Sequence, residues 1–140
     1  MTAKYYLGVD VGSKTLGLAT SRGLIATGYG VYRFPENDFA QAAQYLAELI
    51  TTNQFSDIII GYPKNMNNTI GPRALMVNDF VDILKPLLEA TITIHLVDER
   101  LTTRQAHKIM LEANLSRQKR KQKKDSLAAQ LILEAYLQQK

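Results

Sequence analysis

Residues 5–20 read YYLGVDVGSKTLGLAT, and this stretch decides the fold. Its first five residues are mostly apolar and rich in strand-forming side chains, which predicts a short buried strand. Residues 10–14 interrupt that pattern with turn chemistry, and residues 15–20 partly alternate between apolar and small or polar side chains. We therefore expect two strands that pair back on each other in an antiparallel hairpin.

The remaining pattern extends this hairpin into a sheet covered by helices. Apolar residues recur at helical spacing in four later segments, and three further runs are typical of strands. We expect strands at residues 28–34, 57–60 and 92–97, and helices at residues 38–52, from Pro72 to Pro86, from Thr102 to about residue 113, and from near Asp125 to about Leu137. Because helices separate the later strands, those strands should run parallel. The element order β-β-β-α-β-α-β-α-α predicts a mixed five-stranded α/β sheet in one domain that spans residues 1–140.

Length and composition are those of a single globular domain. The chain has 140 residues, of which 46% are apolar and 21% are charged, so it can bury a core of its own. No apolar run reaches the roughly 18 residues of a membrane span, and the first residues lack a secretory signal. The absence of cysteine excludes disulfides, thiolate metal sites and a cysteine nucleophile. We expect a cytoplasmic protein.

Positive charge is concentrated in one segment. The net charge is +4, and residues 117–124 (RQKRKQKK) hold six of the 17 basic residues and no acidic residue. The rest of the chain has 11 basic and 13 acidic residues, a net charge of −2. Such a local excess usually marks a contact with a polyanion such as nucleic acid. A solvated loop that keeps the protein soluble is the alternative interpretation.

Four acidic residues occupy places where a parallel sheet brings side chains together. Asp10 ends the first strand, and Asp125 opens the final helix. Asp98 and Glu99 end the fifth strand. The carboxyl ends of parallel strands meet at one edge of a sheet, which is the usual ligand site of open α/β folds. Asp125 shares a helix face with the small and apolar residues that follow it, so that face should bring it toward the sheet.

Carboxylates gathered at one edge would repel one another and raise each other's pKa. A divalent hard cation removes that repulsion, and oxygen ligands without cysteine or a nearby histidine suit Mg²⁺ or Mn²⁺. Two such ions could activate a water and stabilise the leaving oxygen of a phosphodiester. One residue of strand register decides whether Asp98 or Glu99 faces this site.

Each of these acids also has a purely structural interpretation. Asp10 could shape the turn that follows it. Asp125 could be only the N-cap of the last helix, which is the common role of aspartate at a helix start. Glu99 could form a surface ion pair with Arg100 or Arg104. Spacing alone therefore leaves the metal site as one of several interpretations.

The loop at residues 61–73, GYPKNMNNTIGPR, leaves a strand at the same edge and ends on a helix start. It is rich in amides and glycines, and it carries two cations, Lys64 and Arg73. Free backbone N–H groups at a helix N-terminus bind phosphate. We therefore expect this loop to bind an anion rather than to act as a plain crossover.

Four segments together resemble the YqgF/RuvX family of bacterial nucleases. They occur in the family's order and span nearly the whole chain: residues 7–19 (LGVDVGSKTLGLA), 61–74, 97–103 and 124–133. The resemblance implies an RNase H-like fold, with catalytic, metal-binding carboxylates at Asp10, Glu99 and Asp125. It also implies a cytoplasmic role in maturing the 5′ end of precursor 16S rRNA, and kinship with Holliday-junction resolvases.

We therefore expect metal-assisted hydrolysis of a phosphodiester bond, with Mg²⁺ or Mn²⁺ held by Asp10, Glu99 and Asp125. The nucleic acid should be precursor rRNA, or else branched DNA. Its backbone should contact these residues: Lys14, Lys64, Asn65, Arg73, Arg100, Arg117, Lys119, Arg120, Lys121, Lys123 and Lys124. Contacts with the ribosome are a further expectation, and monomer and dimer both stay open.

Three other functions are compatible with parts of this pattern. A Holliday-junction resolvase would cut four-way DNA as a symmetric dimer. An rRNA-binding assembly factor would keep the fold without catalysis, which the three acids argue against. A sugar-kinase or actin-like ATPase also opens on an Asp-x-Gly turn, but it needs two lobes, and 140 residues supply only one.

Overall fold

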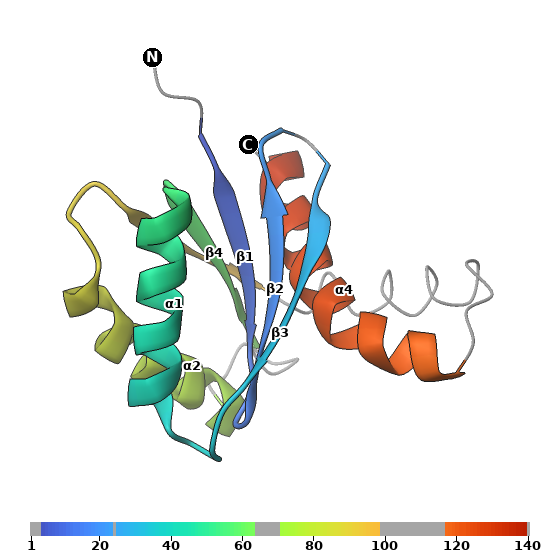
Figure 1. Ribbon diagram of the computed structural model, residues 1–140, viewed down its shortest axis with the longest axis horizontal. Coiled ribbons are helices and arrows are strands. Elements are labelled where there is room, and N and C mark those ends of the chain that lie inside the picture. The colour runs from blue at the N-terminus through green and yellow to red at the C-terminus, as the bar shows by residue number, and fades with distance from the viewer. Residues whose placement is uncertain (1–3, 24, 64–70, 99–116, 140) are drawn as a thin grey trace.

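The computed structural model describes residues 4–23, 25–63, 71–98 and 117–139, with the backbone alone described at residues 117–125 and 139 (Figure 1). Within these residues the elements are, in chain order, β1 (Tyr6–Val11), β2 (Thr15–Ser21), β3 (Thr27–Arg33), α1 (Phe39–Asn53), β4 (Asp57–Tyr62), α2 (Pro72–Leu84), the 3₁₀ turn η1 (Lys85–Leu87), β5 (Thr93–Asp98) and α4 (Arg117–Gln139). No helix among them is long and apolar enough to cross a membrane.

The strands form one sheet in the order β3-β2-β1-β4-β5. Strand β2 pairs antiparallel with both β1 and β3. Strands β1, β4 and β5 run parallel, with β4 between the other two. The predicted mixed five-stranded sheet is confirmed. One strand, β4, lies between β1 and β5, so the carboxyl ends of β1 and β5 lie near each other at one edge of the sheet. The helix expected from Thr102 to about residue 113 lies outside the described residues.

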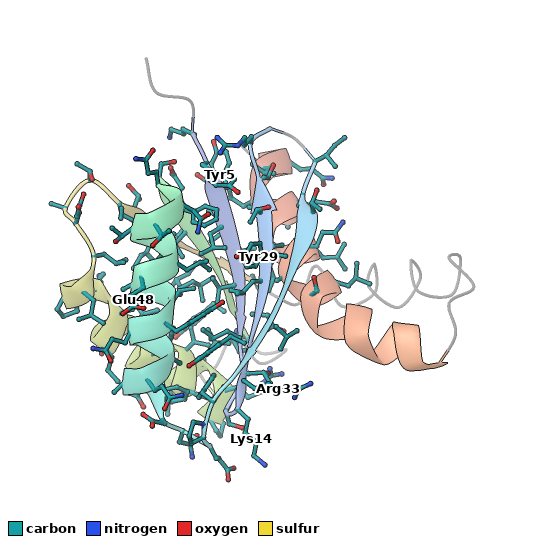
Figure 2. The ribbon with its side chains drawn as sticks, in the orientation of Figure 1. Tyr5, Lys14, Tyr29, Arg33 and Glu48 are labelled. Carbon is teal, nitrogen blue, oxygen red and sulfur yellow. The ribbon has the colours of Figure 1, made fainter. Side chains whose placement is uncertain are left out.

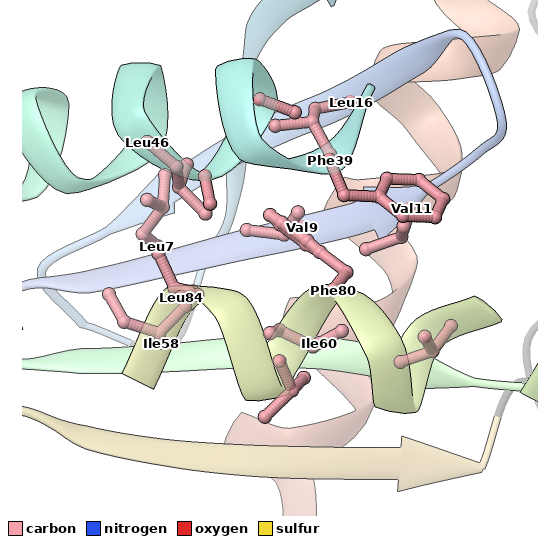
Figure 3. Packing of buried hydrophobic residues seen from close by; sticks show 14 of the residues in the cluster. Leu7, Val9, Val11, Leu16, Phe39, Leu46, Ile58, Ile60, Phe80 and Leu84 are labelled. Atoms are coloured by element: carbon pink, nitrogen blue, oxygen red, sulfur yellow. The ribbon is translucent and has the colours of Figure 1, made fainter. Parts of the chain in front are cut away.

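Helices α1 and α2 cover one face of the sheet, and α4 covers the other (Figure 1). On the first face, Leu7 and Val9 of β1 pack beneath the fully buried Leu46 of α1 and Phe80 of α2 (Figure 3). On the second face, a smaller core joins four of the strands to α4: Tyr6, Ala19, Ala26, Ile59, Val97, Ala129, Ile132, Leu133 and Leu137. Because the central strands are buried on both faces, most of their residues are apolar.

Local sequence chemistry sets the bounds of α1 and α2. The Asp38 carboxylate accepts a hydrogen bond from the Gln41 backbone N–H at 3.2 Å and caps the start of α1. Helix α1 ends at Asn53 and is capped by Gln54, whose backbone is left-handed with a φ of 61°. Pro72 occupies the first turn of α2, as the sequence predicts, because a proline there loses no hydrogen bond. Both helices therefore lie where the sequence places them.

Helix α4 lies close to the sheet because glycines line its path. A Cβ at Gly8 of β1 would lie 2.8 Å from the Ala129 carbonyl oxygen and 2.9 Å from the Leu133 Cβ. A Cβ at Gly28 of β3 would overlap the Ser126 hydroxyl. A larger residue at Gly8 would push the helix away from the sheet, whereas a Cβ at Gly28 would require the Ser126 hydroxyl to rotate away.

The last helix begins earlier than the sequence predicts. Helix α4 starts at Arg117, so the start expected near Asp125 is wrong, and so is the expectation that Asp125 lies at a helix N-terminus. Residues 117–124 are helical because Lys, Arg and Gln are good helix formers and no Gly or Pro interrupts them. The interpretation of Asp125 as only an N-cap is therefore excluded, and the basic segment is not a loop.

Strand β1 is longer than predicted, and Asp10 belongs to it. Asp10 pairs with Gly17, and Val11 pairs with Leu16, so the turn itself comprises residues 12–14. The antiparallel pairing with β2 holds these two residues in the strand. Asp10 therefore lies in the sheet, one residue before the carboxyl end of β1.

Candidate active site

Asp10 lies on the face of β1 that α4 covers. Leu7, Val9 and Val11 point into the core beneath α1 and α2. Successive strand residues point to opposite faces, so Gly8 and Asp10 belong to the other face, where Gly8 touches α4. Asp10 is half-buried there. The structure thus provides a carboxylate, partly accessible to solvent, at the carboxyl edge of the sheet.

Asp98 lies on the opposite face from Asp10. Val97 is buried in the core beside α4, so the next residue of β5 belongs to the face of α1 and α2. The register agrees, because Asp98 pairs with Tyr62, which packs in the core beneath α1 and α2. The structure therefore does not bring Asp98 to the face of Asp10. Glu99, the other candidate at this strand end, lies outside the described residues.

Helix α4 runs antiparallel to β1, so its residues approach the carboxyl edge in reverse order. The rings of Tyr136 and Tyr6 lie 6.0 Å apart near the amino end of β1. Ala129 lies against Gly8, two residues further along the strand. Ser126 lies against Gly28 of β3, and its hydroxyl is 3.5 Å from the Leu18 carbonyl oxygen of β2. The helix therefore leads across β2 toward β3 as it approaches Asp125, whose side chain lies outside the described residues.

The described residues hold one carboxylate of the expected metal-binding set. Within residues 4–23, 25–63, 71–98 and the described side chains of α4, no group of three His, Cys, Asp or Glu could hold a metal ion. Glu99 and the side chain of Asp125 are not among the residues and side chains that the structure describes. Asp10 fits the expected cation, because a carboxylate oxygen is the hard ligand that Mg²⁺ and Mn²⁺ prefer.

Exposed cations lie at the same end of the sheet. Lys14 is in the β1–β2 turn, and Arg73 is in the first turn of α2, which follows the carboxyl end of β4. Arg33 ends β3, and Figure 2 shows it at the same end as Lys14. The sequence analysis did not include Arg33, because the face of the sheet to which it belongs depends on strand register. The only signal in the sequence was a cation at the end of a predicted strand. Lys64, Asn65 and Arg100 lie outside the described residues, and only the backbone is described at the other predicted contacts: Arg117, Lys119, Arg120, Lys121, Lys123 and Lys124.

A second carboxylate on the α4 face is neutralised within the protein. Asp57 begins β4 at the amino edge and is 4% exposed. The His95 Nε2–H donates to its Oδ2 at 3.0 Å, and the Lys4 Nζ lies 3.8 Å from the same oxygen. Burial raises the pKa of this carboxyl, but hydrogen bonds from His95 and Ser56 and the charge of Lys4 outweigh it and hold the pKa below its usual value. The Tyr136 hydroxyl lies 3.4 Å from the same His95 nitrogen and links α4 to this network.

Known proteins resemble this chain over nearly its whole length. The model of the RuvX family, described as Holliday junction resolvase, matches residues 4–139. A protein of Mesoplasma florum is 48% identical over 135 residues that cover 94% of each chain, and one of Mycoplasma capricolum is 50% identical over 133 residues that cover 92% of each. Both carry the name "Putative pre-16S rRNA nuclease". Among solved structures, Thermus thermophilus RuvC in complex with a Holliday junction substrate matches with a TM-score of 0.64 and 14% identity, over 97% of this chain and 96% of that one. The RNase H-like fold expected from the sequence is confirmed.

Proposed function

This chain belongs to the RuvX family, and on that premise we propose that it is a metal-dependent nuclease that processes the 5′ end of precursor 16S rRNA. One observation carries the proposal. Asp10 lies at the carboxyl edge of the parallel strands, on the face that α4 covers, and is partly accessible to solvent. Open α/β sheets bind their ligands at this edge. The names of the relatives supply the substrate class. As part of the same proposal, the reaction belongs to ribosome biogenesis in the cytoplasm, and the chain contacts the ribosome.

The catalytic carboxylates in this proposal are Asp10, Glu99 and Asp125. Asp98 is not included, because it lies on the face of α1 and α2. Glu99 and Asp125 are included because segments 97–103 and 124–133 resemble the family's segments that carry these two acids. Strand β1 is hydrogen-bonded on both sides, by β2 and by β4, so it holds the Asp10 carboxylate on a rigid central element.

Mg²⁺ or Mn²⁺ suits this set of oxygen ligands. When bound, two such ions would lower the pKa of a water molecule and stabilise the leaving oxygen of the phosphodiester. The chain itself contributes the negative charge of Asp10, which is held in the sheet. A carboxylate replaced by its amide should therefore leave the fold intact and remove the activity.

The phosphate backbone would be held by cations around this edge. Arg73 is exposed in the first turn of α2, and Gly71, which precedes that turn, supplies no capping side chain to its backbone N–H groups. Residues 117–124 form the first part of α4, which extends away from the sheet (Figure 1). Contacts of this kind recognise phosphate rather than base, so binding should weaken steeply with salt.

Hydrolysis of four-way DNA is the second candidate function. The description of the family as Holliday junction resolvase favours it. Two strands of a junction must be cut together, so a resolvase would act as a symmetric dimer. Dimerisation on a junction, and paired cuts in opposite strands, would distinguish it from an rRNA-processing enzyme.

Cleavage of two labelled substrates side by side tests the proposal. One is an RNA that carries the 16S leader and the mature 5′ end, and the other is a four-way DNA junction. Both are incubated with the chain and Mg²⁺ or Mn²⁺, and the Asp10→Asn variant controls for contaminating nuclease. We expect cleavage of the RNA at the mature end, dependent on metal and absent in the variant.

The other outcomes have definite meanings. Symmetric cutting of the junction alone would replace the proposal with the resolvase function. Tight, salt-sensitive binding without cleavage of either substrate would indicate an rRNA-binding assembly factor. Equal cleavage by the wild-type chain and by Asp10→Asn would reject Asp10 as a catalytic residue.

A further inference from the structure

Arg33 is the last residue of β3 and lies on the same face of the sheet as Asp10. Its register partner is Thr15, and the neighbouring pair, Tyr32 and Leu16, packs with the core beneath α1. Strand alternation therefore places Arg33 on the face that α4 covers. Arg33 is also exposed, so its guanidinium can reach a ligand from solvent.

Two backbone hydrogen bonds hold the β1–β2 turn against the chain that follows β3. The Phe34 N–H donates to the Lys14 carbonyl at 2.9 Å, and the Asn37 N–H donates to the Ser13 carbonyl at 2.7 Å. Lys14 is exposed, and Figure 2 shows it together with Arg33 at the end of the sheet where β1 ends. The two positive charges thus start from fixed backbone positions at one corner of the molecule.

Neither cation is neutralised by an ion pair within the described part of the chain. The ion pairs found there join Lys4 and His95 to Asp57 at the opposite edge. Glu36, the acid nearest to Arg33 in the sequence, forms no ion pair with it among the described residues. A solvated guanidinium can bind a phosphate through two parallel charge-assisted hydrogen bonds.

The spacing between β3 and β1 suits a nucleic acid strand. The two strands are separated by β2, so they lie about 10 Å apart. A nucleic acid strand can span this distance, so one bound strand can reach both Asp10 and Arg33. Helix α4 crosses β3 at Gly28, and its first part, residues 117–124, extends away from the sheet beyond that crossing (Figure 1).

We infer that Arg33, together with Lys14, binds the phosphodiester backbone of the substrate beside the cleaved bond. The inference rests on the proposed function, because that function places the cleaved bond at Asp10. A guanidinium bound to phosphate does not distinguish bases. The contact should therefore set the affinity and the position of the strand, and it takes no part in bond cleavage.

The test compares Arg33→Gln with Arg22→Gln, both in an Asp10→Asn background that does not cut. Arg22 is the matched control, because it is an exposed arginine of the same hairpin whose guanidinium lies 3.9 Å above the Tyr5 ring, near the amino end of β1. Binding of a labelled leader RNA is measured at about 0.05 to 0.3 M salt. For Arg33→Gln, we expect a Kd about five- to tenfold higher at 0.1 M salt, and a slope of log K against log salt that is smaller by about one. Arg22→Gln should match the background protein in both quantities.

Two further variants sharpen the result. Arg33→Lys keeps the charge and should keep the salt slope. Lys14→Gln should change affinity and slope in the same direction as Arg33→Gln. The inference is overturned if Arg33→Gln and Arg22→Gln have the same Kd and the same salt slope.

Binding and cleavage separate this inference from the proposed function. Suppose that the chain with Asp10 intact fails to cut the RNA while Arg33→Gln still lowers the salt slope. The proposed function then fails, and the phosphate contact stands. Suppose instead that the chain with Asp10 intact cuts the RNA normally and that Arg33→Gln leaves the slope of log K against log salt unchanged. The phosphate contact is then rejected, and the proposed function stands.

Discussion

Asp57 and Asp10 lie on the same face of neighbouring parallel strands, but at opposite ends of the sheet. Asp57 begins β4 at the amino edge, where it is 4% exposed and receives a hydrogen bond from His95 and the charge of Lys4. Asp10 lies near the end of β1 at the carboxyl edge, where it is half-buried and exposed cations lie at the same end of the sheet. The same side chain is thus placed in two different electrostatic environments by one fold.

The difference shows how position in a parallel sheet assigns a role to a carboxylate. At the amino edge, the chain supplies its own partners, and the charge of Asp57 holds β4, β5 and α4 together through His95 and Tyr136. The carboxyl edge is where open α/β sheets usually bind their ligands. Asp57 should therefore contribute to stability and Asp10 to activity.

Replacing each aspartate by asparagine should separate these two roles and gives the largest expected effects. Asp10→Asn should lower the rate of RNA cleavage at least about 1000-fold, because the amide cannot supply the negative charge that a cation needs. Asp57→Asn should instead lower the free energy of unfolding by about 2–3 kcal/mol, because it removes the buried carboxylate that the partly exposed His95 and Lys4 contact. Cleavage by single turnover and unfolding in urea measure the two quantities on the same preparations.

As a control, each variant should leave unchanged the quantity that the other variant lowers. Asp10→Asn should keep the unfolding free energy of the wild-type chain within about 0.5 kcal/mol. Asp57→Asn should keep the cleavage rate of its folded fraction within about threefold. Loss of stability in Asp10→Asn, with full activity, would reverse the assignment of the two edges.

Gly8→Ala should have a smaller effect, through the packing of α4. The added Cβ would lie 2.8 Å from the Ala129 carbonyl oxygen and 2.9 Å from the Leu133 Cβ, so the helix must shift. We expect a loss of about 1–2 kcal/mol in unfolding free energy, measured in urea. Gly23→Ala is the matched control, because no atom lies within 4 Å of the Cβ it would add. Equal stability of the two variants would contradict the close packing of α4 on β1.

The pH dependence of stability should show the smallest effect. The pKa of Asp57 is lowered in the folded chain, so the unfolded chain binds its proton at a higher pH. The stabilisation is therefore fully present above about pH 4, the ordinary range of an aspartate, and is lost as the pH falls through the lowered folded-state pKa. Unfolding in urea between about pH 2 and pH 6 should show a steeper loss for the wild-type chain than for Asp57→Asn. Identical pH profiles would show that the Asp57 network does not contribute in this way.

Local sequence patterns predicted most of the fold. The strands expected at residues 28–34 and 57–60 are found at Thr27–Arg33 and Asp57–Tyr62, because periodicity and turn residues act over a few positions. Pro72 marked the start of α2 correctly for the same reason. The order of helices between strands was sufficient to predict the mixed sheet.

Non-local features were beyond these patterns. The basic residues before Asp125 are charged and good helix formers, so their composition alone fits a loop or a helix, and the structure shows the helix. The face of Arg33 depends on its register with β2, and the burial of Asp57 depends on a histidine from β5. The face of the sheet to which Asp98 belongs became clear only from the burial of Val97 beside α4, which shows to which face each residue of β5 points. Each of these facts requires pairing between distant segments.

If the nuclease site lies on the α4 face of the carboxyl edge, Asp98 and its neighbour Glu99 should differ sharply in their effect on cleavage. Asp98→Asn and Glu99→Gln each remove one carboxylate charge, one residue apart. The measurement is single-turnover cleavage of the 16S leader RNA with Mn²⁺ by the two variants. Glu99→Gln should lose at least about 100-fold in rate, and Asp98→Asn should stay within about threefold of the wild-type chain. A loss confined to Asp98→Asn would instead place the site on the face of α1 and α2.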